Sequence, residues 1–163
     1  MPADAAAIAA IYAPLVSDTI VSFEEEPPSA EEMAKRIAAS HVWLVAEEDS
    51  AVVGYAYAAT FHPRAAYRWS TEASIYLAPY ARGRGVGKQL VATLLERLKE
   101  MGFVNVFGGT ALPNPASERL LESFGFKEVA HWEHVGFKLG GWHDVSWRQL
   151  TLQEPTVPPP ELR

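Results

Sequence analysis

The segment most suited to chemistry is a short run of glycines and cations. Residues 82–88 read RGRGVGK and lie between a predicted strand and the clearest predicted helix. Glycine lets backbone N–H groups approach a ligand closely, and a helix start adds unpaired N–H donors and a positive dipole end. Arg82, Arg84 and Lys88 add three positive charges. The segment therefore favours a phosphate or pyrophosphate ligand over an ordinary tight turn.

Two common phosphate-binding patterns do not fit this segment. The pattern G-x-x-x-x-G-K-[ST] fails because Gln89 follows Lys88 and no glycine stands five residues before Gly87. The dinucleotide pattern G-x-G-x-x-G is also absent. What remains is R-x-x-G-x-G, from Arg82 to Gly87. Nucleotide hydrolysis and dinucleotide binding are both disfavoured.

A second candidate is Glu72, in the predicted strand that precedes this segment. It shares one strand face with Ser74 and Tyr76. A carboxylate among apolar strand residues is costly to bury without a partner. Glu72 is therefore either a water-facing residue of an edge strand or a general base whose pKa is raised by partial burial.

Hydrophobic periodicity predicts the elements that position these residues. Helices are expected at 4–16, 29–40, 86–101 and about 115–123, and Pro14 is expected to end or kink the first of them. Strands are expected at 41–47, 52–61, 71–78, 103–111, about 126–138 and about 143–152. The order predicts a single mixed α/β domain over residues 1–152, with helices on the faces of one sheet. A proline-rich tail, 153–163, is expected to be extended on the surface.

Composition narrows the class of protein further. The chain has 163 residues, a formal net charge of −6 and no cysteine. The acidic balance argues against nucleic acid as a partner, and no apolar run approaches the roughly 20 residues of a membrane span. The first residues lack the basic region of a secretory signal. We expect a soluble cytoplasmic protein without disulfides or metal, since His131, His134 and His143 form no known zinc pattern.

Five stretches together resemble the GNAT superfamily of N-acetyltransferases, and within it the phosphinothricin and methionine sulfoximine acetyltransferase branch. They are VSFEEEPP (21–28), PRAAYRWSTEASIYL (63–77), ARGRGVG (81–87), LPNPASERLLESFGF (112–126) and GFKLGGWHDV (136–145). The resemblance implies a mostly antiparallel central sheet, acetyl-CoA as co-substrate, a homodimer and a small-molecule amine acceptor. That acceptor would be an amino acid analogue of the phosphinothricin, methionine sulfoximine or methionine sulfone type.

The resemblance also assigns roles to residues. Glu72 matches the catalytic glutamate, which acts as the general base. The pyrophosphate of acetyl-CoA is expected at Arg82, Gly83, Arg84, Gly85, Val86, Gly87 and Lys88. The pantetheine arm is expected along Ile75, Tyr76 and Leu77 and at Asn114, although Asn114 also suits a turn between two prolines. The strand from Glu72 to Leu77 spans about 16 Å, the order of length that this arm needs. Acceptor-site residues are expected at Phe23, Arg64, Tyr67 and Tyr76.

Two positions depart from the family pattern. Leu121 stands where relatives carry a tyrosine or histidine that protonates the departing thiolate, so water, Tyr76 or no group at all performs that step here. Relatives also begin with a strand before the opening helix, and we expect this first strand to be missing. Two other functions stay open: a protein or peptide N-acetyltransferase, which the loop at 61–69 would obstruct, and a non-catalytic acyl-CoA sensor, which would not need Glu72.

Overall fold

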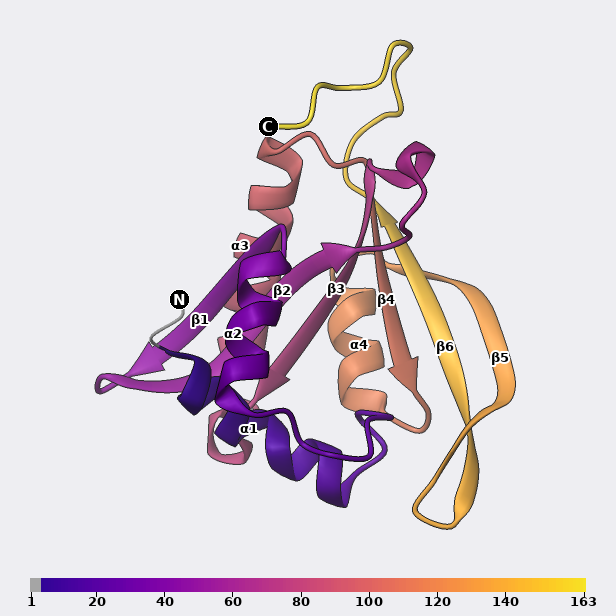
Figure 1. Ribbon diagram of the computed structural model, residues 1–163. Helices are drawn as coiled ribbons and strands as arrows, with labels where there is room; N and C mark the ends of the chain where they lie inside the picture. The colour runs from indigo at the N-terminus through magenta and orange to yellow at the C-terminus, as the bar shows by residue number, and fades with distance from the viewer. Residues whose placement is uncertain (1–3) are drawn as a thin grey trace.

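Six strands form one sheet in the computed structural model, which describes residues 4–163 (Figure 1). The strands are β1 (Val42–Glu48), β2 (Ala51–Thr60), β3 (Ser70–Leu77), β4 (Asn105–Ala111), β5 (Lys127–Lys138) and β6 (Gly141–Thr151). Their order across the sheet is β1-β2-β3-β4-β6-β5. Within the described chain every neighbouring pair is antiparallel except β3 and β4. The predicted mixed, mostly antiparallel sheet is confirmed.

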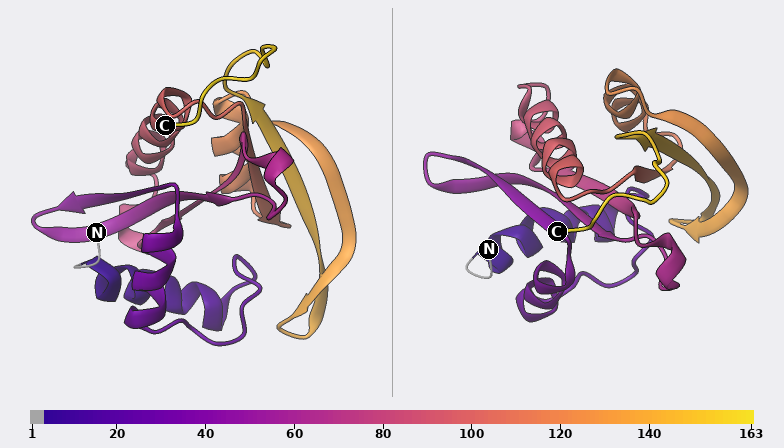
Figure 2. Two further views of the ribbon diagram at one scale, coloured as in Figure 1. Left: turned by 45° about the horizontal axis from the view of Figure 1, so that its top comes forward. Right: turned by 90° about the horizontal axis from the view of Figure 1, so that it is seen from above.

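The helices cover the two faces of this sheet in pairs (Figure 2). They are α1 (Ala5–Asp18), α2 (Ala30–Ala39), α3 (Val86–Glu100) and α4 (Pro115–Ser123), with short 3-10 turns η2 (Ala65–Tyr67) and η3 (Pro79–Ala81). The α1–α2 side has its own apolar core, to which Ile8, Tyr12 and Tyr55 belong. The α3–α4 side has a larger one, which includes Leu98 and Val106. Burial on both faces holds the sheet between the helix pairs.

Pro14 was predicted to end or kink the first helix, and the prediction that it ends the helix is wrong. Helix α1 continues past Pro14 to Asp18. Proline removes one helical hydrogen bond, but the residues that follow are strongly buried, with Leu15 at 7% exposure and Val16 at 0%. Their packing keeps the last turn helical. The predicted absence of a strand before this helix concerns residues 1–3, which lie outside the described residues.

The tail at 153–163 lies mostly on the surface and has no helix or strand, as expected, but it does not extend away from the domain. It folds back over the end of α3 (Figure 1). The indole Nε1 of Trp69 donates to the carbonyl of Pro160 at 2.8 Å, and the amide of Arg163 donates to the carbonyl of Met101 at 3.1 Å. Leu162 packs against the α3-side core. Proline content alone did not reveal these distant partners.

The two halves of the sheet separate between β3 and β4. These strands pair at three positions only, and the last is Glu72 opposite Phe107. Beyond it β3 stays paired with β2 as far as Leu77, while β4 stays paired with β6 as far as Ala111. Figure 1 shows the gap widening from the paired end, with α4 beside it.

Candidate active site

A cleft of about 620 Å³ occupies the gap between the separated strands. Both strands, the start of α3, the helix α4 and the segment after α1 contribute side chains to it. The residues that line it include Val21, Ser74, Ile75, Tyr76, Leu77, Arg82, Gly83, Gly85, Gly87, Lys88, Gly108, Thr110, Asn114, Ser117 and Leu121. Most of the residues predicted to bind the cofactor are therefore brought together in one place.

The glycine-rich segment forms the turn that leads into α3. Gly83 and Gly85 have φ angles of +72° and +85°, a conformation that favours glycine. A Cβ on Gly87 would meet the side chain of Leu77 at 3.4 Å, so this glycine permits close packing of helix and strand. The first N–H groups of α3 have no acceptor within the helix and point toward its start. The turn therefore suits an anion, as predicted.

The cations of this segment are not equivalent. Arg82 and Lys88 line the cleft, and Arg82 also donates to the carbonyl of Leu77 at 3.5 Å. Arg84 instead forms an ion pair with Glu48 in β1, with 2.8 Å between Nη1 and Oε2. The side chain of Val86 is buried in the α3-side core. Only part of the predicted set therefore presents its side chains to the cleft.

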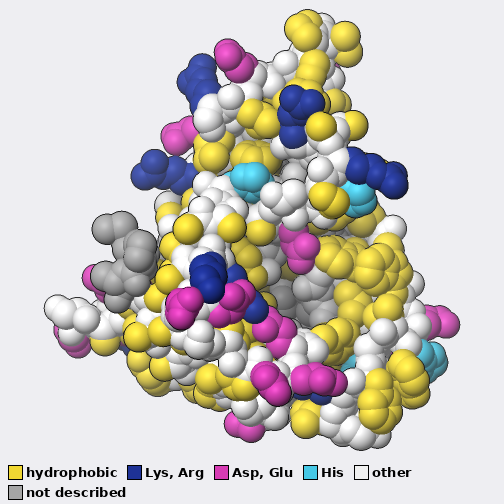
Figure 3. Space-filling model, in the orientation of Figure 1, with side chains coloured by type: hydrophobic (Ala, Val, Ile, Leu, Met, Phe, Trp, Pro, Cys, Tyr) yellow, Lys and Arg dark blue, Asp and Glu magenta, His cyan; other side chains and the backbone are white. Residues whose placement is uncertain are grey.

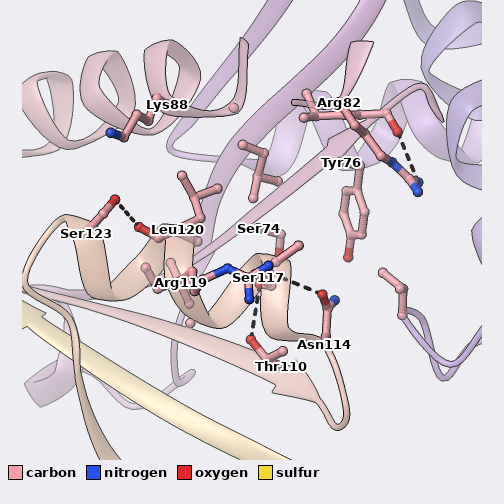
Figure 4. A pocket seen from close by; sticks show the side chains of 18 of the residues that line it. Ser74, Tyr76, Arg82, Lys88, Thr110, Asn114, Ser117, Arg119, Leu120 and Ser123 are labelled. Atoms are coloured by element: carbon pink, nitrogen blue, oxygen red, sulfur yellow. Dashed lines mark hydrogen bonds between the residues drawn. The ribbon is translucent and has the colours of Figure 1, made fainter. Parts of the chain in front are cut away.

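The strand β3 offers a free edge to the cleft. Past Glu72 it has no β4 neighbour, so its backbone groups on that side are available to an extended ligand, which would bind like an added strand. Ile75, Tyr76 and Leu77, the residues predicted to bind the pantetheine arm, line the cleft along this edge. Figure 4 shows Ser74 and Tyr76 facing the start of α4 across the cleft.

Asn114 combines the two roles that the sequence left open. It is the N-cap of α4, and its Oδ1 accepts from the amide of Ser117 at 3.2 Å. It also lines the cleft beside Ser117 (Figure 4). Sequence reasoning missed Ser117 and Thr110, whose hydroxyl oxygens lie 3.4 Å apart. The capping pattern of Asn114 with a serine three residues later was the available signal for Ser117.

Glu72 lies at the inner end of the gap, on the sheet face covered by α1 and α2. It is half-buried between Ala59 of β2 and Phe107 of β4. Burial raises the pKa of its carboxyl above the ordinary value of 4.5. Its face also carries Ser74, which lines the cleft. A carboxylate held in this way is a stronger proton acceptor than a solvated one, which is what a general base requires.

The face of the molecule that carries α1 and α2 is hollowed. In Figure 3 a depression lies between the α1–α2 side and a band of hydrophobic side chains on the opposite side, with an acidic side chain at its upper rim. Phe23, on the segment between α1 and α2, packs against β5 next to Gly136. Val21 of the same segment lines the cleft. The predicted wall residue Phe23 therefore belongs to a segment that reaches the site.

Arg64 and Tyr67 lie elsewhere than the other predicted acceptor residues. They line a second hollow of about 260 Å³, beside η2 and the folded-back tail. His41, His62, Arg68 and Arg163 also line it. Its lining residues include no aspartate or glutamate, so this hollow is locally cationic in an acidic protein. Ser70, at the start of β3, connects its lining with the strand that carries Glu72.

Leu121 cannot transfer a proton, and the structure shows what it does instead. It is 8% exposed and packs beneath Gly108, where a Cβ would meet its Cδ1 at 3.2 Å. It thus forms an apolar floor of the cleft. Tyr76 also lines the cleft. Burial raises the pKa of its hydroxyl well above the ordinary value of 10, so this hydroxyl keeps its proton.

Two further properties concern the described chain as a whole. Residues 4–163 contain no group of three or more histidine, cysteine, aspartate or glutamate side chains that could hold a metal ion. His131 instead pairs with Asp144 at 2.8 Å. None of the helices in this part of the chain is both long and apolar enough to cross a membrane.

Comparison with known proteins decides the family. The family model for the acetyltransferase (GNAT) family matches residues 8–126, a range that includes Glu72, the glycine-rich turn and α4. The chain belongs to the acetyltransferase (GNAT) family. It is an acetyl-CoA-dependent acetyltransferase, and its cleft, glycine-rich turn and free β3 edge fit that co-substrate.

Relatives within this family are similar over nearly the whole chain. A phosphinothricin N-acetyltransferase of Alcaligenes faecalis is 40% identical, over 95% of this chain and 82% of that protein. An L-methionine sulfoximine/L-methionine sulfone acetyltransferase of Pseudomonas aeruginosa is 33% identical, over 94% and 92%. The crystal structure of a GNAT superfamily phosphinothricin acetyltransferase from Sinorhizobium meliloti in complex with acetyl-CoA matches with a TM-score of 0.92, at 38% identity, over 96% and 88%.

Proposed function

We propose that this enzyme transfers the acetyl group of acetyl-CoA to the α-amino group of a small amino acid analogue, with Glu72 as the general base. The observation that carries this proposal is the place of Glu72. It is a half-buried carboxyl with a raised pKa at the point where β3 leaves β4 and the cleft begins. A thioester carried along the free edge of β3 would end beside it.

The chemistry needs few groups from the protein. Acetyl-CoA supplies the acyl thioester. The glycine-rich turn, with Arg82 and Lys88, binds the pyrophosphate, and the β3 edge and Asn114 orient the arm. Glu72 accepts the proton that the ammonium group of the acceptor loses, directly or through a water molecule. No nucleophilic residue is required, so transfer is direct within a ternary complex. No side chain is assigned as proton donor to the departing thiolate, because burial raises the pKa of the Tyr76 hydroxyl and so makes it a weaker acid.

The relatives and the site together support this acceptor class. Relatives named for phosphinothricin and methionine sulfoximine support an amino acid analogue that carries a tetrahedral polar group. We assign Phe23 and Tyr76 to the walls of the acceptor site. Arg64 lines the second hollow, whose lining reaches Ser70, two residues before Glu72. It is the proposed partner of the acidic group of the acceptor on that side of Glu72, with Tyr67 beside it, because an arginine fork suits carboxylate or phosphinate geometry.

We also propose a homodimer in the cytoplasm. The hairpin of β5 and β6 exposes large apolar side chains at 48–62% of their surface: Val129, Trp132, Val135, Phe137, Leu139 and Trp142. An exposed apolar patch of this kind is typical of a protein–protein interface. A second copy of the chain is the partner that we favour, and the cytoplasmic location is carried over from the composition of the chain.

The proposal is tested by product analysis with purified enzyme and acetyl-CoA. Phosphinothricin, methionine sulfoximine, methionine sulfone and a short peptide with a free N-terminus are offered in turn, and acetylated products are measured by mass spectrometry. We expect N-acetylated amino acid analogues, and an Arg64→Met variant with a raised acceptor KM. Acetylation of the peptide alone would favour a protein acceptor, and binding of acetyl-CoA without any product would favour a sensor.

A further inference from the structure

The loop between α1 and α2 is held firmly on its inner side. We call residues 19–24 the Phe23 loop. Tyr12 of α1 shares a hydrogen bond of 2.7 Å with Ser22 and donates another of 2.8 Å to Glu24. Arg36 of α2 binds the same glutamate with two nitrogens, at 2.7 and 3.0 Å. The loop is thereby fixed to both of its own helices.

A distant lysine holds the loop from the other side. The Nζ of Lys138, at the end of β5, donates to the carbonyl of Val16 at 2.5 Å and to that of Ser22 at 2.6 Å. Val16 belongs to the last turn of α1, where unpaired carbonyls and the negative end of the helix dipole favour a cation. Lys138 therefore joins the hairpin to both the helix end and the Phe23 loop.

A glycine in the same strand makes room for the ring of Phe23. A Cβ added to Gly136 would overlap this ring, so the ring lies directly on the β5 backbone. Phe23 is 39% exposed in this position, and its ring centroid lies 6.4 Å from that of His143 in β6. Any larger residue at position 136 would force the ring to another rotamer.

An irregularity in β5 brings Gly136 and Lys138 toward α1. The pairing of β5 with β6 is interrupted between Trp132 and Gly136, and His134 there has a φ of +49°. Asp144 fixes the irregular segment, because its Oδ1 accepts from the amide of His134 at 2.8 Å and its Oδ2 bonds Nε2 of His131 at 2.8 Å. Irregularities of this kind redirect a strand and occur beside active sites.

We propose that Gly136 and Lys138 are positioning residues for the acceptor: they hold the Phe23 loop against the hairpin, and so keep Phe23 and Val21 in place at the acceptor end of the cleft. The inference rests on the proposed function, in which Phe23 is a wall of the acceptor site. It adds that the β5–β6 hairpin, far from Glu72 in the sequence, sets acceptor affinity. It predicts separate effects on the two substrates, since the hydrogen bonds that hold the loop come from α1, α2 and β5 and not from the pyrophosphate turn.

The first test is Gly136→Ala, which displaces the Phe23 ring and leaves Lys138 in place. We expect the KM for methionine sulfoximine to rise about tenfold, which corresponds to about 1.4 kcal/mol of binding free energy. The KM for acetyl-CoA should stay within about twofold. Gly141→Ala is the matched control on the same hairpin, because a Cβ there would meet only His143, at 3.7 Å.

The second test is a double-mutant cycle with Phe23→Ala. If Gly136 acts through the Phe23 ring, Gly136→Ala has no further effect on acceptor KM in the Phe23→Ala background. Lys138→Met should raise the acceptor KM as well, and should speed hydrogen exchange of the amides of residues 19–24. An unchanged acceptor KM in Gly136→Ala, additive effects in the cycle, or equal rises in both KM values would overturn the inference while the enzyme still turned over. Absence of turnover by the wild type would instead overturn the proposed function, and this inference with it.

Discussion

Glu72 and Phe107 face each other at the last position that β3 and β4 share. This pairing fixes where the sheet opens, and so where a ligand lying along β3 must end. It also explains why a carboxylate can be half-buried there, because the strand is paired on both sides at Glu72 and open beyond it. The proposed proton acceptor and the closed end of the cleft are therefore defined by the same register.

The raised pKa of Glu72 predicts that this residue costs stability. The folded protein disfavours the ionised carboxyl, so the penalty is fully present above the raised pKa and disappears below the ordinary value of 4.5. Thermal melts at pH 8 should show Glu72→Gln melting above the wild type, and the difference should vanish at pH 4. Glu96→Gln, on the exposed face of α3, is the control. A wild type more stable than Glu72→Gln at pH 8 would argue against the buried environment.

Lys88 is expected to act on the cofactor and not on the acceptor. It lines the cleft in the first turn of α3, where its charge meets the proposed pyrophosphate. Replacing it with methionine should raise the KM for acetyl-CoA by about tenfold, the effect of losing one charge-assisted hydrogen bond of about 1.5 kcal/mol. Lys99→Met, in the exposed last turn of the same helix, should leave both KM values unchanged. Equal effects of the two variants would show that Lys88 contributes only general charge.

Arg148 is expected to matter for stability because it ties α4 to β6. It is 5% exposed, donates to Ser146 at 2.9 Å and reaches Glu118 and Glu122 of α4 at 3.1 Å each. Arg148→Met should lower the free energy of unfolding by about 2 kcal/mol in urea titrations, through lost bonds to charged groups. Arg97→Met, exposed on α3, should change it by less than about 0.5 kcal/mol. A similar small change in Arg148→Met would mean that apolar packing alone holds α4.

The exposed hairpin predicts the oligomeric state. Trp142 is 62% exposed and stacks edge-on with Phe137, at 5.3 Å between ring centroids. Light scattering with size exclusion should report a dimer for the wild type and a monomer for Trp142→Glu, since a buried unpaired charge opposes association. Val157→Glu, in the tail, should remain dimeric. A wild type that is monomeric at all concentrations would refute the dimer.

Local patterns sufficed for the elements and for part of the site. The apolar stripe of α3 predicted a helix at 86–101, and the structure has Val86–Glu100. The glycine-rich turn could be found because glycine freedom is a local property, whereas Asn114 was assigned to the site by the family resemblance. The strand predicted from residue 103 begins only at Asn105. The backbone of Val104 bonds Trp69 and Leu152, which lie just outside the neighbouring strands.

Distant pairings could not be predicted in the same way. Nothing in the sequence of β3 marks Glu72 as its last position beside β4, because register depends on how two separate strands meet. The ion pair of Arg84 with Glu48 and the bonds from Lys138 to the α1 end join residues far apart in the chain. These contacts decided which predicted residues face the cleft and which do not.

The most direct test of Glu72 as the base is the pH dependence of kcat/KM for wild type and Glu72→Gln, measured as CoA release with methionine sulfoximine. The wild-type rate should fall as pH drops through a pKa above the ordinary value of 4.5, because the protonated carboxyl cannot accept a proton. Glu72→Gln should have a kcat lower by about 10²-fold or more, and its kcat/KM should no longer show this fall at low pH. Its affinity for acetyl-CoA should stay within about twofold. A variant that keeps the wild-type rate and the same pH profile would contradict the assignment of Glu72 as the general base.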